Sequence, residues 1–261
     1  MKFVGKHILS VSEFDRAAIE RVFAVADQME PYAQRKKATR VLEGAILGSM
    51  FFEPSTRTRV SFGCAFNLLG GEVRETTELK ATSIAKGESF YDTARVLSGY
   101  SDVIVMRHQI EGSVAEFSEA SRVPVINGGD GANEHPSQAL LDLYTIRKEL
   151  AAKNKSIDGL SISLIGDLRF GRAVHSLCKL LSLFKHIQFN LISPPELSLP
   201  DEYIVAMRDA GHNVNQSTEL QPNISGADIL YVTRTQEERF PNQEEANLSL
   251  YTTSNPPKQS R

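Results

Sequence analysis

Residues 51–59 place hydroxyl and guanidinium groups where an apolar run ends and an amphipathic segment begins. In open α/β sheets, ligands bind beyond the carboxyl ends of strands, and a helix amino terminus offers unpaired N–H groups to an anion. The side chains that suit an anion here are Ser55, Thr56, Arg57 and Thr58. Their hydroxyl groups can donate hydrogen bonds, and the guanidinium fork matches phosphate oxygens. Taken alone, the segment also fits plain helix capping with solvated arginines.

Two further predicted strands, residues 103–106 and 123–126, end in polar side chains of the same kind. The first strand leads into Arg107, and the second leads into a loop that contains His135 and Gln138. A proline follows the histidine and suits the first position of a helix, so the amide lies three residues along the same helix face. Singly, His135 fits a helix-end residue facing water and Gln138 fits a surface amide, but together with an arginine they indicate one binding edge.

A second group of polar residues follows later strands, in residues 166–176 and 233–239. The glycine spacing of the first segment is similar to a phosphate loop, but Arg172 and Ala173 stand where a nucleotide and its Mg²⁺ require Lys and Ser or Thr. The segment also lacks the dinucleotide glycine fingerprint. A nucleotide site is therefore not predicted.

The elements that must position these residues follow a βα alternation. Ser12 and Asp15 could open a helix whose stripe of apolar positions runs over residues 14–29, and three apolar runs then alternate with helix-like segments. After the polar connector 151–159 the alternation restarts. The later apolar runs are residues 161–166, 188–193 and 227–233. Nearly continuous apolar strands are typical of parallel sheets, so we expect an α/β fold with two parallel-sheet domains, the second incomplete.

Bulk composition excludes several functions. The chain has 261 residues, 41% of them hydrophobic, and a formal net charge of -3, so no global attraction to nucleic acid or to anionic membranes is expected. No stretch approaches the length of a membrane span or a secretory signal, which favours a cytoplasmic protein. Cys64 and Cys178 lie far apart in apolar, helix-like stretches, and we expect both to be buried free thiols rather than a disulfide or a metal cluster.

The first group of residues resembles the carbamoyl phosphate site shared by aspartate and ornithine carbamoyltransferases. The resemblance implies that Ser55, Thr56, Arg57 and Thr58 hold the phosphate. It also implies that Thr58, Arg107 and His135 polarise the carbonyl oxygen, while Gln138 contacts the carbamoyl amine. This agrees with the chemistry, because attack of an amine on that carbon builds negative charge on the oxygen, which preorganised donors stabilise. Neither a metal nor a cofactor is expected.

Residues 82–88 read by themselves as a solvated connector. They also resemble the mobile loop of this family, in which a serine and a lysine reach the active site of the neighbouring subunit. The matching positions are Ser83 and Lys86, and the lysine then joins the catalytic set. The resemblance implies a homotrimer with shared active sites, and it leaves a regulatory chain open as a further partner.

Residues 166–176 and 233–239 resemble the aspartate carbamoyltransferase form of the second domain. The resemblance implies that Arg172, Arg234 and Gln236 bind L-aspartate. Two arginines suit a dicarboxylic amino acid, whereas the cationic side chain of ornithine would be repelled.

The resemblance covers residues 6–240, and residues 241–261 have a polar composition that predicts a disordered tail. We expect a carbamoyl phosphate-binding domain at residues 1–150 and an incomplete aspartate-binding domain at residues 151–240. The predicted activity is carbamoyl transfer from carbamoyl phosphate to aspartate, giving N-carbamoyl-L-aspartate and phosphate in pyrimidine synthesis. The alternative is an impaired, C-terminally truncated chain that assembles with or titrates complete subunits.

Overall fold

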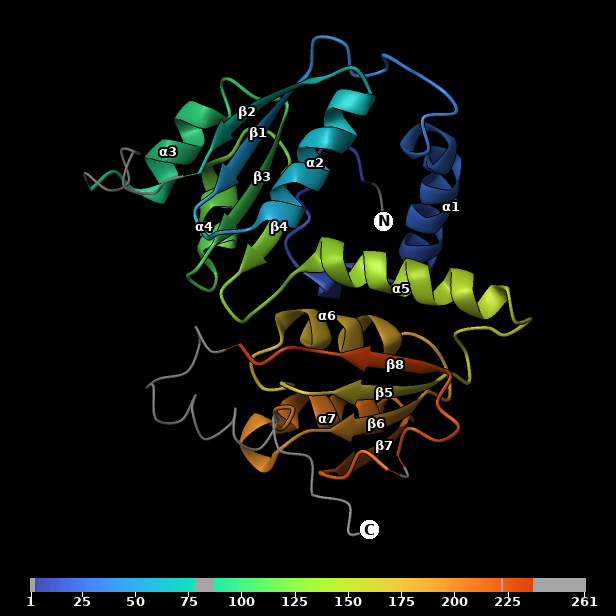
Figure 1. The fold of residues 1–261 in the computed structure, drawn as a ribbon. Coiled ribbons are helices and arrows are strands. Elements are labelled where there is room, and N and C mark those ends of the chain that lie inside the picture. Colours follow the sequence, from blue (N-terminus) through green and yellow to red (C-terminus); the bar gives the residue numbers. More distant parts are fainter. Residues whose placement is uncertain (1–2, 78–86, 222, 237–261) are drawn as a thin grey trace. The chain divides into compact units, whose positions relative to one another are not determined.

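The computed structural model describes residues 3–77, 87–221 and 223–236. The chain divides into two compact units, Met1–Gln138 and Ala139–Arg261, and each contains a four-stranded parallel sheet (Figure 1). The predicted α/β class with parallel sheets is confirmed. The division falls ahead of the polar connector at residues 151–159. None of the helices in the described ranges is long and apolar enough to cross a membrane.

The first sheet has the spatial order β2-β1-β3-β4, and every neighbouring pair is parallel. These strands are β1 (Ile46–Phe51), β2 (Glu72–Thr76), β3 (Val103–His108) and β4 (Val125–Asp130). Parallel strands need a crossover connection, and helices supply it here. All four carboxyl ends therefore lie at one edge of the sheet.

Helices cover both faces of this sheet. They are α2 (Thr56–Leu68), α3 (Phe90–Leu97) and α4 (Ser113–Ala120). The unit begins with a short 3-10 turn, η1 (Val11–Glu13), and with α1 (Arg16–Ala33), which contacts α2. Figure 1 shows α2 on one face of the sheet and α3 and α4 on the other. The helix expected to open near Ser12 and Asp15 begins at Arg16, where the Asp15 carboxylate accepts the N–H of Ala18 at 2.6 Å. It continues through Pro31, before which it was expected to end.

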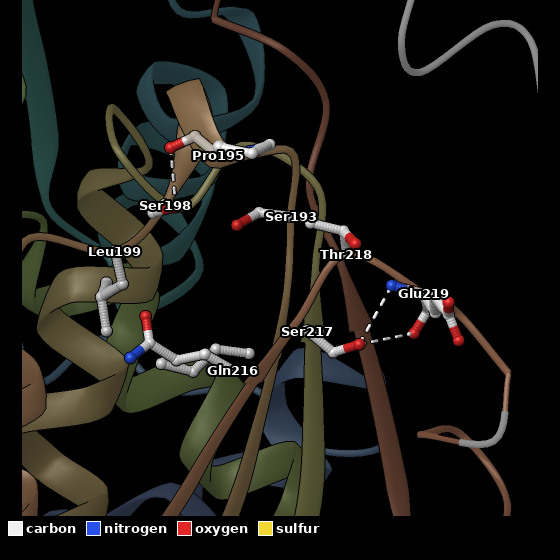
Figure 2. A pocket seen from close by; sticks show the side chains of 9 residues that line it. Ser193, Pro195, Ser198, Leu199, Gln216, Ser217, Thr218 and Glu219 are labelled. Carbon is white, nitrogen blue, oxygen red and sulfur yellow. Dashed lines mark hydrogen bonds between the residues drawn. The ribbon is translucent and has the colours of Figure 1, made fainter.

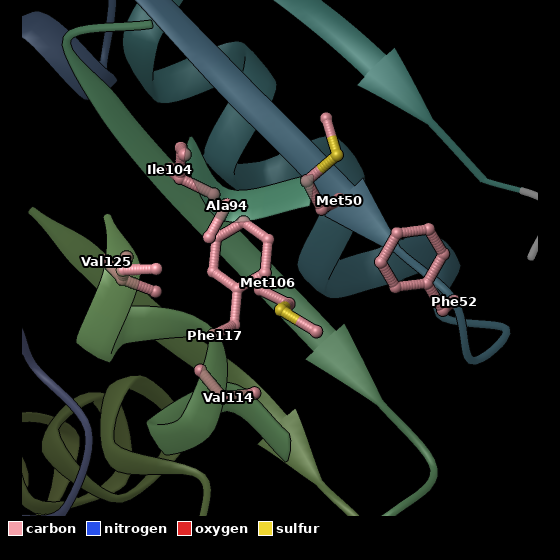
Figure 3. Packing of buried hydrophobic residues seen from close by; sticks show 9 residues of the cluster. Met50, Phe52, Ala94, Ile104, Met106, Val114, Phe117 and Val125 are labelled. Carbon is pink, nitrogen blue, oxygen red and sulfur yellow. The ribbon is translucent and has the colours of Figure 1, made fainter. Parts of the chain in front are cut away.

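Alternate residues of each strand supply the two core layers. Leu47 and Phe51 of β1 pack with Phe62 and Phe66 of α2. The opposite face contributes the cluster drawn in Figure 3, which contains Met50, Phe52, Ile104, Met106 and Phe117. Successive side chains of a strand point to opposite faces of the sheet. When helices cover both faces, the strand must therefore be apolar throughout. This explains the continuous apolar runs of the sequence.

The second sheet has the order β7-β6-β5-β8, again with parallel neighbours only. Its strands are β5 (Ser161–Ile165), β6 (Gln188–Ile192), β7 (Asn213–Ser217) and β8 (Ile229–Val232). The helices are α5 (Pro136–Ala151), within which the chain divides, α6 (Arg172–Leu181) and α7 (Asp201–Asp209), with a 3-10 turn, η4 (Pro195–Leu197). The α6 residues Val174, Leu177 and Leu181 are fully buried. The Tyr231 hydroxyl of β8 donates to the carboxylate of Asp142 in α5 at 2.8 Å.

The prediction of two buried thiols is correct for Cys178 and wrong for Cys64, which is exposed. Phe62 and Phe66 turn one face of α2 toward the sheet. A residue two positions after Phe62 lies about 200° around the helix and therefore faces solvent. Apolar neighbours in the sequence did not reveal this because they belong to the other face of α2.

Candidate active site

Each sheet reverses its strand order at one point, and several of the predicted site residues lie beside these points. In the first sheet the reversal lies between β1 and β3, and in the second it lies between β5 and β8. Ligands of open α/β sheets bind at such switch points, beyond the carboxyl ends of the strands. Residues 55–58 follow β1 and Arg107 lies in β3, while Arg172 follows β5 and Arg234 follows β8.

The amino terminus of α2 is open to an anion. Ser55 is the N-cap residue, yet its side chain makes no capping hydrogen bond. In α1 and α3 the capping side chains of Asp15 and Ser89 do accept a first-turn N–H, at 2.6 and 3.0 Å. A serine at this position normally satisfies one of the unpaired N–H groups of the first turn. The α2 terminus therefore keeps its donors for a ligand, which argues against the simple capping explanation.

The side chains around this terminus differ in exposure. Thr56 and Arg57 are exposed, whereas Ser55 and Thr58 are half-buried. Arg59, the next arginine, instead forms an ion pair of 2.7 Å with Glu75 of β2. Of the two arginines in the motif, Arg57 is thus the one whose guanidinium is placed to meet a solvent-borne anion.

Arg107 lies beside this segment in the sheet. The register pairs Phe51 of β1 with Arg107 of β3. The guanidinium donates to the Glu53 carboxylate at 2.8 Å and to the carbonyl oxygen of Gly128 at 3.3 Å. Both charged side chains are mostly buried, with 11% and 18% of their surface exposed. Contacts from two different strand ends thus fix this arginine at the switch point.

Glu53 was not among the predicted site residues. Its position gave a usable signal, because it follows the end of β1 directly and precedes the serine and threonine of the motif. Since an unpaired buried charge is costly, an acidic residue beside a predicted anion site is a candidate ion-pair partner for a buried arginine.

The neighbouring His108 faces the other side of the sheet. It is 1% exposed, its Nδ1 accepts the N–H of Ile110 at 3.0 Å, and its ring meets Phe52 and Phe90 edge-on. Burial lowers the pKa of this imidazole below 6.5, although the charge of Glu53 opposes the shift. His108 is therefore a neutral packing residue and contributes no positive charge to the site.

His135 lies directly before α5, as the sequence predicted. It is 6% exposed, which excludes a histidine simply facing water. Its Nδ1 lies 3.4 Å from the Ser137 hydroxyl, and its carbonyl oxygen accepts the N–H of Gln138 at 3.1 Å. Gln138 is half-buried in the first turn of the helix. The loop after β4 thus delivers both residues at the edge of the sheet where Arg107 lies.

In the second unit, a buried carboxylate joins the two segments that carry the predicted aspartate ligands. Asp167 has no exposed surface. Its Oδ1 accepts the N–H of Phe170 and its Oδ2 accepts the N–H of Gln236, both at 2.9 Å. Gly166 allows the close approach, since a Cβ there would stand 2.4 Å from the Thr233 carbonyl oxygen. The β5–α6 loop and the segment after β8 are therefore held together.

Arg172 is the first residue of α6 and is 6% exposed. The loop before it is fixed by His175, whose Nε2 lies 2.9 Å from the carbonyl oxygen of Leu168 and whose ring stacks on Tyr203. Arg234 is exposed and donates to the Thr235 carbonyl at 3.0 Å. The Gln236 amide donates to the Arg234 carbonyl at 3.1 Å. The backbone segments bearing all three predicted ligands thus meet at the second switch point.

Ser83 and Lys86 lie outside the described residues, so the proposed loop from a neighbouring subunit is not part of this geometry.

A separate cavity of about 440 Å³ opens at the carboxyl ends of β6 and β7. Its lining is largely polar and includes Ser193, Gln216, Ser217 and Thr218 (Figure 2). None of the predicted ligands lines it.

Two family models match the chain. The model described as "Aspartate/ornithine carbamoyltransferase, carbamoyl-P binding domain" matches residues 6–148. The model described as "Aspartate/ornithine carbamoyltransferase, Asp/Orn binding domain" matches residues 158–254. The second match continues beyond Phe240, so the prediction that the resemblance stops at that residue is wrong.

Similar proteins agree with these matches. The aspartate carbamoyltransferase catalytic subunit of Saccharophagus degradans is 71% identical over 248 residues, which cover 95% of this chain and 74% of the relative. The corresponding subunit of Archaeoglobus fulgidus is 49% identical over 240 residues, covering 92% and 77%.

Solved structures give the same result. The catalytic subunit of M. jannaschii aspartate transcarbamoylase has a TM-score of 0.85 at 45% identity, covering 95% of this chain and 79% of that one. The Trypanosoma cruzi aspartate transcarbamoylase in complex with carbamoyl phosphate and aspartate has a TM-score of 0.87 at 38% identity, covering 96% and 78%. With both family models matched and a relative 71% identical, the chain belongs to the aspartate/ornithine carbamoyltransferase family.

Proposed function

We propose that the chain transfers the carbamoyl group of carbamoyl phosphate to the amino group of L-aspartate, giving N-carbamoyl-L-aspartate and phosphate. The observation that carries this proposal is the uncapped amino terminus of α2 beside Arg107, at the switch point of the first sheet. Relatives named aspartate carbamoyltransferase catalytic subunit support the choice of reaction. The product is an intermediate of pyrimidine synthesis.

In the proposed reaction the amine nitrogen of aspartate attacks the carbonyl carbon of carbamoyl phosphate. A C–N bond forms, the C–O bond to phosphate breaks, and the departing phosphate takes the proton of the amine. Negative charge develops on the carbonyl oxygen, where Thr58, Arg107 and His135 donate. Such preorganised donors stabilise the transition state more than the ground state, because they need no rearrangement as the charge appears.

The phosphate group is assigned to the α2 terminus. Ser55, Thr56 and Arg57 supply backbone and side-chain donors there, and Thr58 adds a hydroxyl from the first turn. An anion gains both from these hydrogen bonds and from the positive end of the helix dipole. Gln138, at the start of α5, contacts the carbamoyl amine. The carbamoyl phosphate-binding domain is residues 1–150 in this proposal.

Aspartate is assigned to the second switch point, within a domain at residues 151–240. Arg172 and Arg234 pair with the two carboxylates, and Gln236 contributes an amide. Support comes from Asp167, which holds the two backbone segments together. Guanidinium forks bind carboxylates in a fixed orientation, which would present the amine of aspartate to the carbamoyl carbon.

Ser83 and Lys86 are assigned to the active site of a neighbouring subunit, so the working form is a homotrimer. A regulatory chain is a further partner in this proposal, and the proposed location is the cytoplasm. Chains carrying Lys86→Ala and Arg57→Ala should recover activity when mixed into one trimer, because one shared site keeps both residues. No recovery in an assembled trimer contradicts the shared site.

A direct test of the reaction compares two arginines of the same helix. Arg57→Ala should lower kcat/KM for carbamoyl phosphate by about a hundredfold or more, as loss of one transition-state donor does. Arg59→Ala is the matched control, since that arginine pairs with Glu75 and should cost only a few-fold. Equal losses in the two variants would contradict the assignment of the phosphate to the α2 terminus.

A further inference from the structure

Asp130 is the last residue of β4, and its side chain is almost completely buried, with 2% of the residue exposed. Its two carboxylate oxygens accept four hydrogen bonds. Oδ1 accepts from the Asn127 side-chain amide at 2.9 Å and from the N–H of Glu134 at 3.2 Å. Oδ2 accepts from the N–H of Gly112 at 3.0 Å and from the Asn133 side-chain amide at 3.0 Å.

These donors come from three parts of the first unit. Gly112 is the N-cap residue of α4, with a left-handed φ of 77°, Asn127 lies within β4, and the other two donors lie in the loop before α5. The backbone of this loop closes on the same residue, since Asp130 N–H donates to the Glu134 carbonyl at 3.3 Å and its own carbonyl accepts from Asn133 at 3.1 Å. One buried carboxylate therefore connects three chain segments.

Glu134, one of these donors, is followed directly by His135, and α5 begins at Pro136. Glu134 is anchored a second time, because its carboxylate accepts the Ser10 hydroxyl at 3.1 Å. A buried carboxylate whose four acceptor sites are filled tolerates little movement of its donors, since each lost hydrogen bond leaves a buried polar group unsatisfied. The direction in which the loop delivers its final residues is thus set at Asp130.

We infer that Asp130 is a positioning residue for the carbamoyl end of the ligand, which it serves by fixing the loop that carries His135 and Gln138. The inference rests on the proposed function, in which these two residues contact the carbamoyl group. The phosphate end is held by a different element, the amino terminus of α2. Damage at Asp130 should therefore affect recognition of the carbamoyl group and spare recognition of phosphate.

The test is Asp130→Asn in the full chain, with binding of carbamoyl phosphate and of inorganic phosphate measured by calorimetry. The new amide keeps the shape but turns an N–H₂ group toward two N–H donors. Affinity for carbamoyl phosphate should fall about tenfold, the equivalent of one good hydrogen bond, while affinity for inorganic phosphate stays within about twofold.

The matched control is Asp102→Asn. Asp102 also accepts a backbone N–H, from Ile46 at 2.8 Å, but at the amino end of β1, far along the strands from the binding edge. This variant should bind both ligands as the wild type does. A general effect of losing a loop carboxylate in this unit would instead appear in both variants.

A milder variant decides the question if Asp130→Asn does not fold. Asn133 is exposed, so Asn133→Ala removes one donor to Asp130 without opening the core. It should weaken carbamoyl phosphate binding in the same direction, by a smaller factor, and leave phosphate binding unchanged.

Wild-type affinity for carbamoyl phosphate in folded Asp130→Asn, or equal loss of both ligands, overturns the inference. If Asp130→Asn does not fold, wild-type binding of carbamoyl phosphate by Asn133→Ala overturns it as well. The proposed function fails in a different pattern, in which the wild type and Arg57→Ala bind carbamoyl phosphate equally weakly.

Discussion

Arg107 and Glu53 form an ion pair of 2.8 Å at the carboxyl edge of the first sheet, where β1 and β3 run side by side. The carboxylate offsets the charge of the arginine, and the Gly128 carbonyl holds the guanidinium from the other side. An anion that binds Arg107 must therefore share it with Glu53 or displace this carboxylate. The pair keeps the arginine in place before the ligand arrives.

Replacing Glu53 by Gln tests this competition. The amide keeps an oxygen that can accept from Arg107 but removes the negative charge beside the anion site. Affinity for inorganic phosphate should rise by a few-fold, about 1 kcal/mol or less, because the repulsion is partly screened by solvent. Calorimetric titration with phosphate measures it, and Glu75→Gln, which removes the partner of Arg59, serves as the control. Unchanged or weaker binding by Glu53→Gln would argue against the competition.

Asp167→Asn should disturb the aspartate half. The carboxylate accepts the N–H groups of Phe170 and Gln236, and Asn can accept only one of them. We expect the free energy of unfolding to drop by about 1–3 kcal/mol and the KM for aspartate to rise. Chemical denaturation and steady-state kinetics measure the two effects.

The control for this variant is Asp158→Asn. In the wild type, the Asp158 carboxylate accepts the N–H of Lys185 at 2.8 Å, and this contact does not lie at the switch point. The amide oxygen of Asn can still accept this single N–H, so the KM for aspartate should stay unchanged. An Asp167→Asn protein with an unaltered KM would show that the contact to Gln236 has no role in substrate binding.

The two cysteines should react at very different rates. Cys64 is exposed on α2, whereas Cys178 lies buried in α6, and burial raises the pKa of its thiol to about 12. Since the thiolate is the reactive form, a thiol reagent should modify one cysteine rapidly in the folded protein and the second only after denaturation. Cys64→Ser should remove the rapid phase, and a rapid phase that survives this change would contradict the burial of Cys178.

The Asp228 carboxyl should make the free energy of unfolding depend on pH in the acid range. Its hydrogen bonds from the Lys155 ammonium and from the Ser161 N–H at 3.0 Å hold the pKa of this carboxyl below its ordinary value of 3.8. The stabilisation is therefore complete above the ordinary pKa and is lost as the pH falls through the folded pKa. Asp228→Asn should be less stable than the wild type near neutral pH, and the difference should shrink toward pH of about 2. Thermal melts across this range measure it, and a difference independent of pH would contradict the ionic contribution.

The sequence predicted the fold class well because its strongest signals are local. Parallel strands covered on both faces read as continuous apolar runs, as Leu47 and Met50 illustrate by facing opposite core layers. The site residues that follow strand ends were predictable for the same reason. Arg107 lies near the carboxyl end of β3 and His135 follows β4, and parallel topology gathers these carboxyl ends at one edge.

The residues that sequence reasoning missed act through long-range contacts. Glu53 meets Arg107, which lies 54 residues away, and Asp167 meets Gln236 across 69 residues. Neither pairing has a periodic signature, since each depends on which strands become neighbours in the sheet. The exposure of Cys64 was missed for a related reason: composition around a residue does not tell which face of its helix packs on the sheet.

The central claim is that this chain carbamoylates aspartate. The most direct measurement supplies carbonyl-labelled carbamoyl phosphate with equal amounts of aspartate and ornithine, and then separates the labelled products. We predict label in N-carbamoyl-L-aspartate alone, at a rate that Arg57→Ala lowers by about a hundredfold or more and Arg59→Ala by only a few-fold. Label in the ornithine product, or no labelled product from a folded wild-type chain that binds carbamoyl phosphate, would contradict the account.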